Sequence, residues 1–93
     1  MFVIVVRCEL HLPAVNSLKG KRAILNRLKD KLKHQGRAAV AEVDHNDLWQ
    51  RATLGMAVVS GDAGHAEQLI DSLRRDMERD PTVVLLDWQV ERY

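Results

Sequence analysis

The segment EVDHNDLWQR, residues Glu42 to Arg51, separates two apolar runs near the middle of the chain. The runs, at about 38–44 and 51–60, have the composition of β-strands. The polar segment between them is short enough for a hairpin connection, and its Asp and Asn residues are typical of turns. The sequence therefore predicts a central pair of strands joined as a hairpin.

The first dozen residues alternate in the manner of a strand with one fully apolar face. That face carries Phe2, Ile4, Val6, Cys8, Leu10 and Leu12, and the other carries Val3, Val5, Arg7, Glu9 and His11. Pro13 ends the strand because it lacks an N–H donor. The thiol of Cys8, between apolar neighbours, is expected to be inert. Because a single cysteine cannot form a disulfide within the chain, the sequence favours a location in the reducing cytoplasm.

A helix is predicted from an N-cap at Asn16 or Ser17 to about Gln35, with a stop at Gly36. Its apolar stripe is Leu18, Ile24, Leu25, Leu28 and Leu32. A second helix starts at Gly61-Asp62 and stops at Asp80-Pro81. Its stripe is Ala66, Leu69, Ile70, Leu73 and Met77.

The last strand is predicted at about 82–91. One of its faces, expected to be buried, carries Val84, Leu86, Trp88 and Val90. The order β-α-β-β-α-β indicates an α+β, ferredoxin-like sandwich in a single domain of residues 1–93. Four antiparallel strands would form one sheet, with two helices on one face. The alternative is a different pairing order of the same strands. In the ferredoxin-like order, the hairpin tip lies near the start of the first helix.

Charge is strongly segregated along a chain whose net charge is only +1. Residues 17–37 hold eight Lys and Arg residues against a single acid, Asp30, and the acidic residues are concentrated after residue 38. A helix with such a face matches the phosphate backbone of RNA, for which charge supplies affinity without sequence choice. The alternative is a solvated cationic surface, neutralised by the acidic remainder or by a dimer partner.

The residues predicted to contact RNA or another anion are Lys19, Lys21, Arg22, Arg27, Lys29, Lys31 and Lys33. The helix start adds free N–H groups at Leu18, Lys19 and Gly20, which suit a phosphate. Recognition on the sheet face is not expected. Base stacking there needs exposed aromatic residues, and the outward positions of the first and third strands have none.

The hairpin tip offers a second set of contact residues: Asp44, His45, Asp47, Trp49 and Arg51. Strand alternation separates Asp44 from His45, so a catalytic dyad is not expected; His45 is placed more easily beside Asp47 or His11. No nucleophile and no metal-ligand spacing accompany them, so the sequence predicts neither an enzyme nor a metal or cofactor site.

A structural role for the same hairpin tip is equally compatible with the sequence. The Asx residues would then bond turn N–H groups, Trp49 would cap the core, and Arg51 would pair with Glu42 or Asp44. A further hypothesis is a homo-oligomeric or small-anion-sensing domain, because the open sheet face would carry Val3, Val5, Val83 and Leu85. The opening apolar run is too short for a signal peptide or membrane span, and no membrane partner is expected.

Four segments of the chain resemble the YlxP-like family of small bacterial proteins, classed as domain of unknown function 503. They are ELHLP at 9–13, SLKGKR at 17–22, AEVDHNDLWQRATLG at 41–55 and AVVS at 57–60. Relatives often carry Glu where this chain has Gly20. The resemblance implies a ferredoxin-like, cytoplasmic, non-enzymatic protein. Family genes neighbour those for transcription-elongation, translation-initiation and ribosome-binding factors, which implies an accessory role with RNA or the ribosome.

Overall fold

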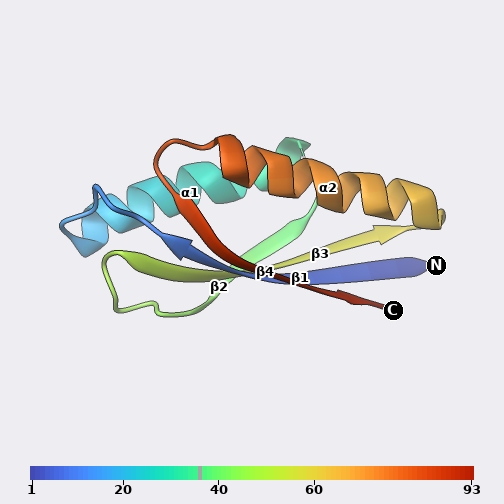
Figure 1. The fold of residues 1–93 in the computed structure, drawn as a ribbon, viewed down its shortest axis with the longest axis horizontal. Helices are drawn as coiled ribbons and strands as arrows, with labels where there is room; N and C mark the ends of the chain where they lie inside the picture. Colours follow the sequence, from blue (N-terminus) through green and yellow to red (C-terminus); the bar gives the residue numbers. More distant parts are fainter. Residues whose placement is uncertain (36) are drawn as a thin grey trace.

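The computed structural model describes residues 1–35 and 37–93, and its elements follow the predicted order (Figure 1). They are β1 (Phe2–His11), α1 (Leu18–Gln35), β2 (Ala39–Asp44), β3 (Arg51–Ser60), α2 (Ala63–Arg79) and β4 (Val84–Arg92). The strands β2 and β4 begin slightly later than predicted. The predicted helix stop at Gly36 lies outside the described residues.

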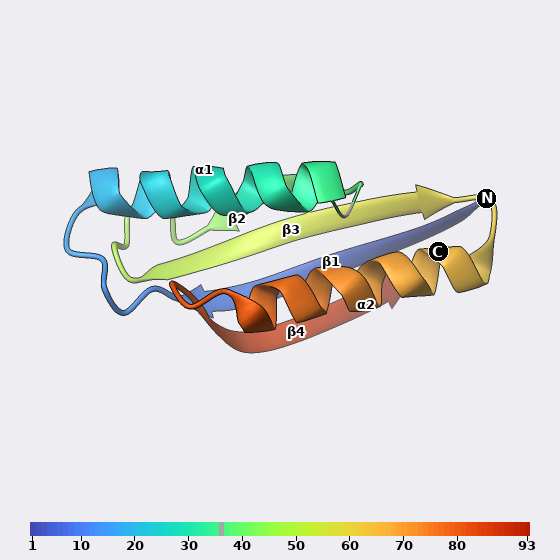
Figure 2. The ribbon, with the colours of Figure 1, turned by 90° about the horizontal axis from the view of Figure 1, so that it is seen from above.

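The four strands form one sheet in the order β2-β3-β1-β4, and every neighbouring pair is antiparallel. Both helices lie on the same face of this sheet (Figures 1 and 2). This arrangement confirms the ferredoxin-like sandwich. His11, at the end of β1, lies opposite Arg51 of β3 and Val84 of β4. The hairpin tip, the start of α1 and the end of α2 therefore lie at one end of the sheet.

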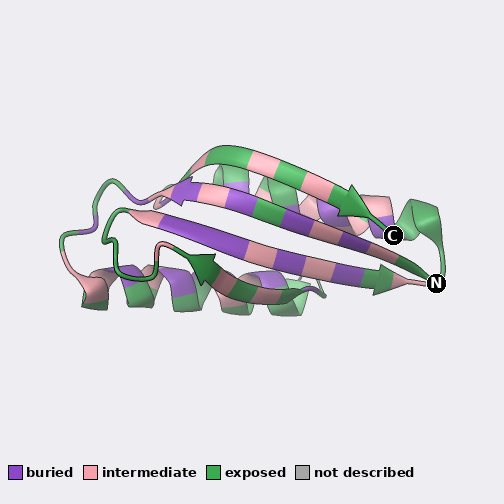
Figure 3. Cartoon of the chain, turned by 90° about the horizontal axis from the view of Figure 1, so that it is seen from below, coloured by how far each residue is buried: buried purple, intermediate pink, exposed green. Residues whose placement is uncertain are grey.

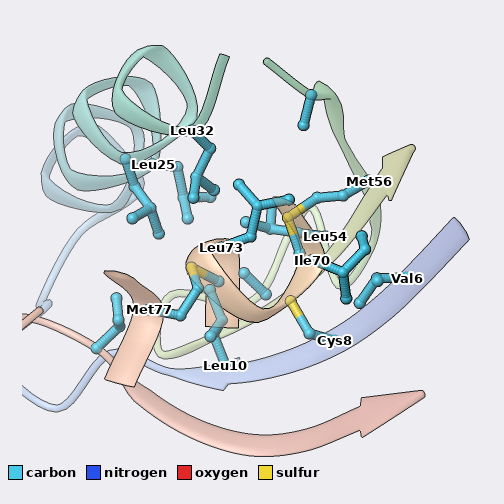
Figure 4. Close-up of a cluster of buried hydrophobic side chains, with 14 of the residues drawn as sticks. Val6, Cys8, Leu10, Leu25, Leu32, Leu54, Met56, Ile70, Leu73 and Met77 are labelled. Atoms are coloured by element: carbon cyan, nitrogen blue, oxygen red, sulfur yellow. The ribbon is translucent and has the colours of Figure 1, made fainter. Parts of the chain in front are cut away.

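The core lies between the sheet and the two helices. Its strand side comes from the even-numbered residues of β1 and β3, and its helix side from the apolar stripes of α1 and α2 (Figure 4). Cys8 is fully buried there, as predicted, and burial raises the pKa of its thiol to about 12. Phe2 points to the same face but is 41% exposed, because it lies opposite Ser60 at the very end of the sheet.

A β-bulge in β4 makes part of the predicted strand face wrong. Leu85 pairs with Leu10 and Asp87 pairs with Glu9, so Leu86 has no opposite residue in β1. The extra residue reverses the alternation before it. Leu86 is 50% exposed, whereas Leu85 packs against the core. Beyond the bulge, Trp88 faces the helices as predicted, with the Arg74 guanidinium 5.8 Å from its ring centre.

The same reversal applies to the two valines before the bulge. Val84 was predicted to be buried and is 47% exposed, and Val83 was predicted on the open face and is buried. At the β4 edge, the open face of the sheet therefore carries Val84 and Leu86, whereas the sequence predicted Val83 and Leu85 there (Figure 3).

Short polar contacts fix the starts of both helices. The Ser17 hydroxyl oxygen accepts a hydrogen bond from the Gly20 N–H at 3.0 Å, and the Asp62 carboxylate accepts one from the His65 N–H at 2.8 Å. These are N-caps of the usual kind. Within the described part of the chain, neither helix is long and apolar enough to cross a membrane.

Candidate functional site

The basic residues of α1 fall into two groups, those that form ion pairs within the protein and those that do not. Lys21 and Arg27 are paired with carboxylates. The remaining five form no ion pair with any residue of the described ranges 1–35 and 37–93. This second group, here termed the α1 basic face, comprises Lys19, Arg22, Lys29, Lys31 and Lys33. Lys29 and Lys31 are partly buried, and the other three are exposed.

Lys21 does not belong to this surface, so its predicted role as an anion contact is wrong. Its side chain is only 2% exposed, and its Nζ donates a hydrogen bond to the His45 carbonyl oxygen at 2.6 Å. Glu42 Oε2 lies 2.9 Å from the same nitrogen, an ionic contact without the geometry of a directed hydrogen bond. Lys21 shares a helix face with Leu25, because the two are one turn apart.

Arg27 joins the two helices at the other side of α1. Its guanidinium donates to both carboxylate oxygens of Asp80, at 3.0 and 3.4 Å, and to the Thr82 hydroxyl at 2.7 Å. Burial acts to raise the pKa of Asp80. The hydrogen bonds from Arg27 and from the hydroxyl and N–H of Thr82 outweigh it, so the pKa lies below its usual value. Arg27 is half exposed and committed to this contact, and is a weaker candidate for binding RNA.

The predicted anion site at the N–H groups of the helix start is also altered. The Gly20 N–H donates to Ser17 Oγ, and the Lys21 N–H donates to the Ser17 carbonyl oxygen. Neither donor points to a ligand. Of the three N–H groups predicted to bind an anion, that of Gly20 is therefore already used, while the exposed side chains of Lys19 and Arg22 add positive charge at this helix end.

The hairpin tip, residues 45–50, is fixed at both of its ends. The Gln50 carbonyl oxygen accepts from the Leu12 N–H at 2.9 Å, and the Gln50 amide donates to the Val15 carbonyl oxygen at 2.9 Å. At the other end, the His45 N–H donates to the Asp44 carboxylate at 2.7 Å, as expected for an Asx residue. His45 has a φ of 59°, a left-handed conformation that costs a residue with a side chain about 1 kcal/mol.

Two large apolar side chains at the tip are about half exposed. Trp49 is 52% exposed and Leu48 is 45% exposed. The prediction that Trp49 folds back to cap the core is therefore wrong. The core at this end is already closed by Leu10, Leu12 and Val15, which are buried. In Figure 3 the tip is the exposed loop that follows β2 on the side of α1.

The His45 ring lies on the open face of the sheet and contacts β1 and β3. The Thr53 hydroxyl donates to Glu9 Oε2 at 2.7 Å, and His45 Nδ1 lies 2.9 Å from the same hydroxyl oxygen. Because the hydroxyl proton is directed to Glu9, Nδ1 must be the donor in the second contact. Nε2 of a neutral His45 is then an acceptor. The expected neighbours of His45 were Asp47 or His11, and the structure places Glu9 and Thr53 there instead.

Arg51 extends this polar cluster along the sheet. Its guanidinium lies 3.8 Å from Glu9 Oε2, and Arg7 lies 3.5 Å from Asp44. The predicted pairing of Arg51 with Glu42 or Asp44 is therefore wrong. Glu42 faces the helices and meets Lys21, whereas Arg51 faces the open side of the sheet. Cross-strand pairs form on one face of a sheet only, so these two side chains do not meet.

The adjacent residues Asp44 and His45 bond to different partners. His45 bonds Thr53, while Asp44 accepts from the backbone, so the two adjacent residues do not form a side-chain dyad in this arrangement. With its pKa raised, Cys8 carries no thiolate at neutral pH. Within residues 1–35 and 37–93, no three His, Cys, Asp or Glu side chains gather as metal ligands.

Sequence reasoning missed four residues that organise this region: Glu9, Glu42, Gln50 and Thr53. The contacts of Glu9, Gln50 and Thr53 join residues 35 to 44 positions apart, and Glu42 meets Lys21 of the preceding helix. One signal was available for Lys21, which occupies a position in the apolar stripe of α1 together with Leu25, Leu28 and Leu32. A lysine in such a stripe is expected to reach a buried partner.

The sheet order and the two helices on one face define a protein of the ferredoxin-like class. Two designed proteins have a similar fold. One is the de novo protein LFR1 1, described as having a ferredoxin fold, with a TM-score of 0.57 and 14% identity over 98% of this chain and 86% of that one. The other is the de novo protein Foldit4, with a TM-score of 0.54 and 13% identity over 100% and 97%. At these identities the likeness concerns the fold alone.

The chain belongs to the family described as protein of unknown function DUF503, whose sequence model matches residues 3–90. It is also similar to the uncharacterized protein YlxP of Bacillus subtilis (strain 168). The two are 27% identical over 85 residues, which cover 87% of this chain and 92% of the relative. The family resemblance inferred from the four sequence segments is thus confirmed.

Proposed function

We propose that this protein is a cytoplasmic, non-catalytic binding module for structured RNA or a ribosomal particle, and that the α1 basic face contacts the phosphate backbone. The observation that carries the proposal is the absence of ion pairs on this face. Among the residues described, those five side chains have no carboxylate partner. Phosphates would supply the missing counter-charge, and the gene neighbourhood that the family resemblance implies favours RNA over other polyanions.

The geometry of the face suits a backbone contact. Lys29 and Lys33 are one helical turn apart, and Arg22 is two turns from Lys29, so the three form a stripe along the helix. If four phosphates are neutralised, raising the salt from about 50 to about 200 mM should weaken binding on the order of a hundredfold. Contacts of this kind position the protein without reading sequence.

The test is the affinity for a structured RNA hairpin and for ribosomal subunits, measured against salt. In the variant Lys29→Glu/Lys33→Glu, we expect weaker binding and a salt slope reduced by about two. The matched control is Arg75→Glu/Arg79→Glu, which makes the same change in net charge at exposed positions of α2. Unchanged affinity of the α1 variant, or an equal loss in the control, would contradict the proposal.

A second candidate is self-association through the β2 edge and the open sheet face. The observation that favours it is a shallow apolar hollow of about 300 Å³ beside β2, lined in part by Val5, Val43 and Ala57. Val43 is 50% exposed, and β2 has an unpaired edge that a second copy could extend. Sedimentation would show dimers that Val43→Lys dissociates. A wild-type protein that remains monomeric, with no stabilisation by phosphate, would argue against this candidate.

A further inference from the structure

An exposed tryptophan is held on a fixed support at the hairpin tip. Gln50, which follows Trp49, is hydrogen-bonded to Leu12 and Val15 in the segment after β1. The Gln50 carbonyl oxygen also accepts a hydrogen bond from His11 Nδ1 at 3.1 Å. At the start of the tip, His45 is bound by Lys21. The tip is thus constrained at both ends, whereas the Trp49 side chain stays half in solvent. A large aromatic surface presented on a constrained backbone loses little conformational freedom on binding.

The surroundings of the tip indicate the chemistry of the partner. The 2.6 Å contact between Lys21 Nζ and the His45 carbonyl oxygen places the tip directly beside the first turns of α1 (Figures 1 and 2). Those turns carry Lys19 and Arg22, which are exposed members of the α1 basic face. An aromatic ring on a loop beside a helix start that carries exposed cations is a combination by which proteins bind single-stranded nucleic acids, with bases stacked on the ring and phosphates on the cations.

We propose that Trp49 is a stacking platform for an unpaired base of the RNA strand whose phosphates lie on the start of α1. This inference rests on the proposed function and narrows the class of RNA that the protein binds, because stacking on Trp49 needs a base that is not already paired. The protein would therefore prefer RNA loops, bulges or ends to a continuous duplex. The platform lies on the hairpin tip, and not on the sheet face where the RRM fold places its aromatic residues.

The negative charge of Asp47 at the hairpin tip indicates how the bound RNA would be oriented. Asp47, two residues before Trp49 in the sequence, is exposed, and its carboxylate repels phosphate. Phosphates are therefore expected over Lys19 and Arg22, and the base over Trp49. An apolar protein partner would cover Trp49 and Leu48 equally well, but it would leave the adjacent cations without counter-charge. The charge complementarity of the two sites together favours RNA.

The probes are three oligomers of equal length: single-stranded uridine RNA, the same ribose-phosphate chain without bases, and duplex RNA. We expect wild type to bind the first about tenfold more tightly than the second. Trp49→Ala should remove that difference and leave duplex affinity unchanged, whereas Trp49→Phe should retain most of it. In a Trp88→Phe background, the fluorescence of Trp49 should be quenched by the single-stranded uridine RNA, and not by the chain without bases or by duplex RNA.

Each contrary outcome identifies which proposal fails. If Lys29→Glu/Lys33→Glu weakens all three oligomers and Trp49→Ala weakens none, stacking is overturned and the binding function stands. If no oligomer binds in a salt-dependent manner, both are overturned. If Trp49→Ala instead dissociates a dimer while RNA affinity is unchanged, the tip is a contact between copies of the chain and the stacking proposal is wrong.

Discussion

Lys21 of α1 and His45 of the hairpin tip are joined by a hydrogen bond of 2.6 Å from the lysine amino group to the histidine carbonyl oxygen. The bond connects the first helix to the tip across the edge strand β2. It satisfies the carbonyl of a residue in a left-handed conformation, and the same amino group meets the Glu42 carboxylate. One buried cation therefore fixes how the tip lies against the helix.

Replacing Lys21 by Met should destabilise the protein by about 2–4 kcal/mol, because the Glu42 carboxylate and the His45 carbonyl lose their partner in a water-poor site. Urea unfolding measures the change, and Lys33→Met, at an exposed position, is the control and should change stability by less than about 0.5 kcal/mol. The double variant Lys21→Met/Glu42→Leu should recover part of the loss. Equal, small effects of the two single variants would contradict the buried contact.

Asp80 should make stability depend on pH in the acidic range. Its pKa is lowered in the folded protein, so its contribution is complete above the unfolded value of about 3.9 and is lost as the pH falls through the folded value. Asp80→Asn should therefore be less stable than wild type at pH 7, and the difference should shrink below about pH 4. Denaturant titrations from pH 7 to pH 2.5 test this, and a difference independent of pH would contradict it.

Thr53→Val should cost about 1–2 kcal/mol, because Glu9 and the His45 ring would lose the hydroxyl that joins them. The variant also tests the tautomer. In wild type, nitrogen chemical shifts of His45 should show the proton on Nδ1 when the ring is neutral, and this preference should weaken in Thr53→Val. A proton on Nε2 in wild type would show that the direction assigned to the Thr53 contact is incorrect.

The bulge in β4 predicts opposite effects for two adjacent leucines. Leu86→Lys should be nearly neutral, since Leu86 is half exposed, whereas Leu85→Lys should cost more than about 2 kcal/mol because Leu85 packs against the core. Thermal unfolding of the two variants measures this directly. Regular alternation through β4 would give the reverse order.

Asp47→Asn should strengthen RNA binding by about twofold at low salt, because it removes a charge that repels phosphate near the start of α1. The gain should vanish at high salt as screening increases. Asp71→Asn, an exposed acid on α2, removes the same charge far from the tip and serves as control. Weaker binding by Asp47→Asn would instead indicate that the Asp47 carboxylate contacts the RNA.

The order of the elements and most of their bounds could be predicted, because alternation, helical spacing and caps are local signals. Phe2–His11 alternates without interruption, and Asp62 and Ser17 are ordinary N-caps. The bulge could not be predicted in the same way. The run 83–86 is apolar throughout, so its pattern does not say which residues face the core until the pairing with Glu9 and Leu10 is known.

The sequence predicted which residues make up the candidate site better than it predicted their contacts. The α1 basic face was identified from its residues, but the burial of Lys21 depends on Glu42 and His45, which are more than twenty positions away. Arg51 meets Glu9 and not Glu42, because strand register decides which face each side chain takes. Contacts across the sheet join residues that are distant in the sequence, and the local patterns of a single sequence do not specify which residues pair.

The cations of the α1 basic face should also make ionic strength act in opposite directions on folding and on complex formation. Lys29 and Lys33 repel each other within the free helix, so added salt should slow its fraying while it weakens the RNA complex. A bound polyanion would relieve the same repulsion without salt. We therefore expect amide hydrogen exchange along the exposed turns of α1 to slow when the partner binds, because the bound polyanion neutralises the charges of the helix and stabilises it.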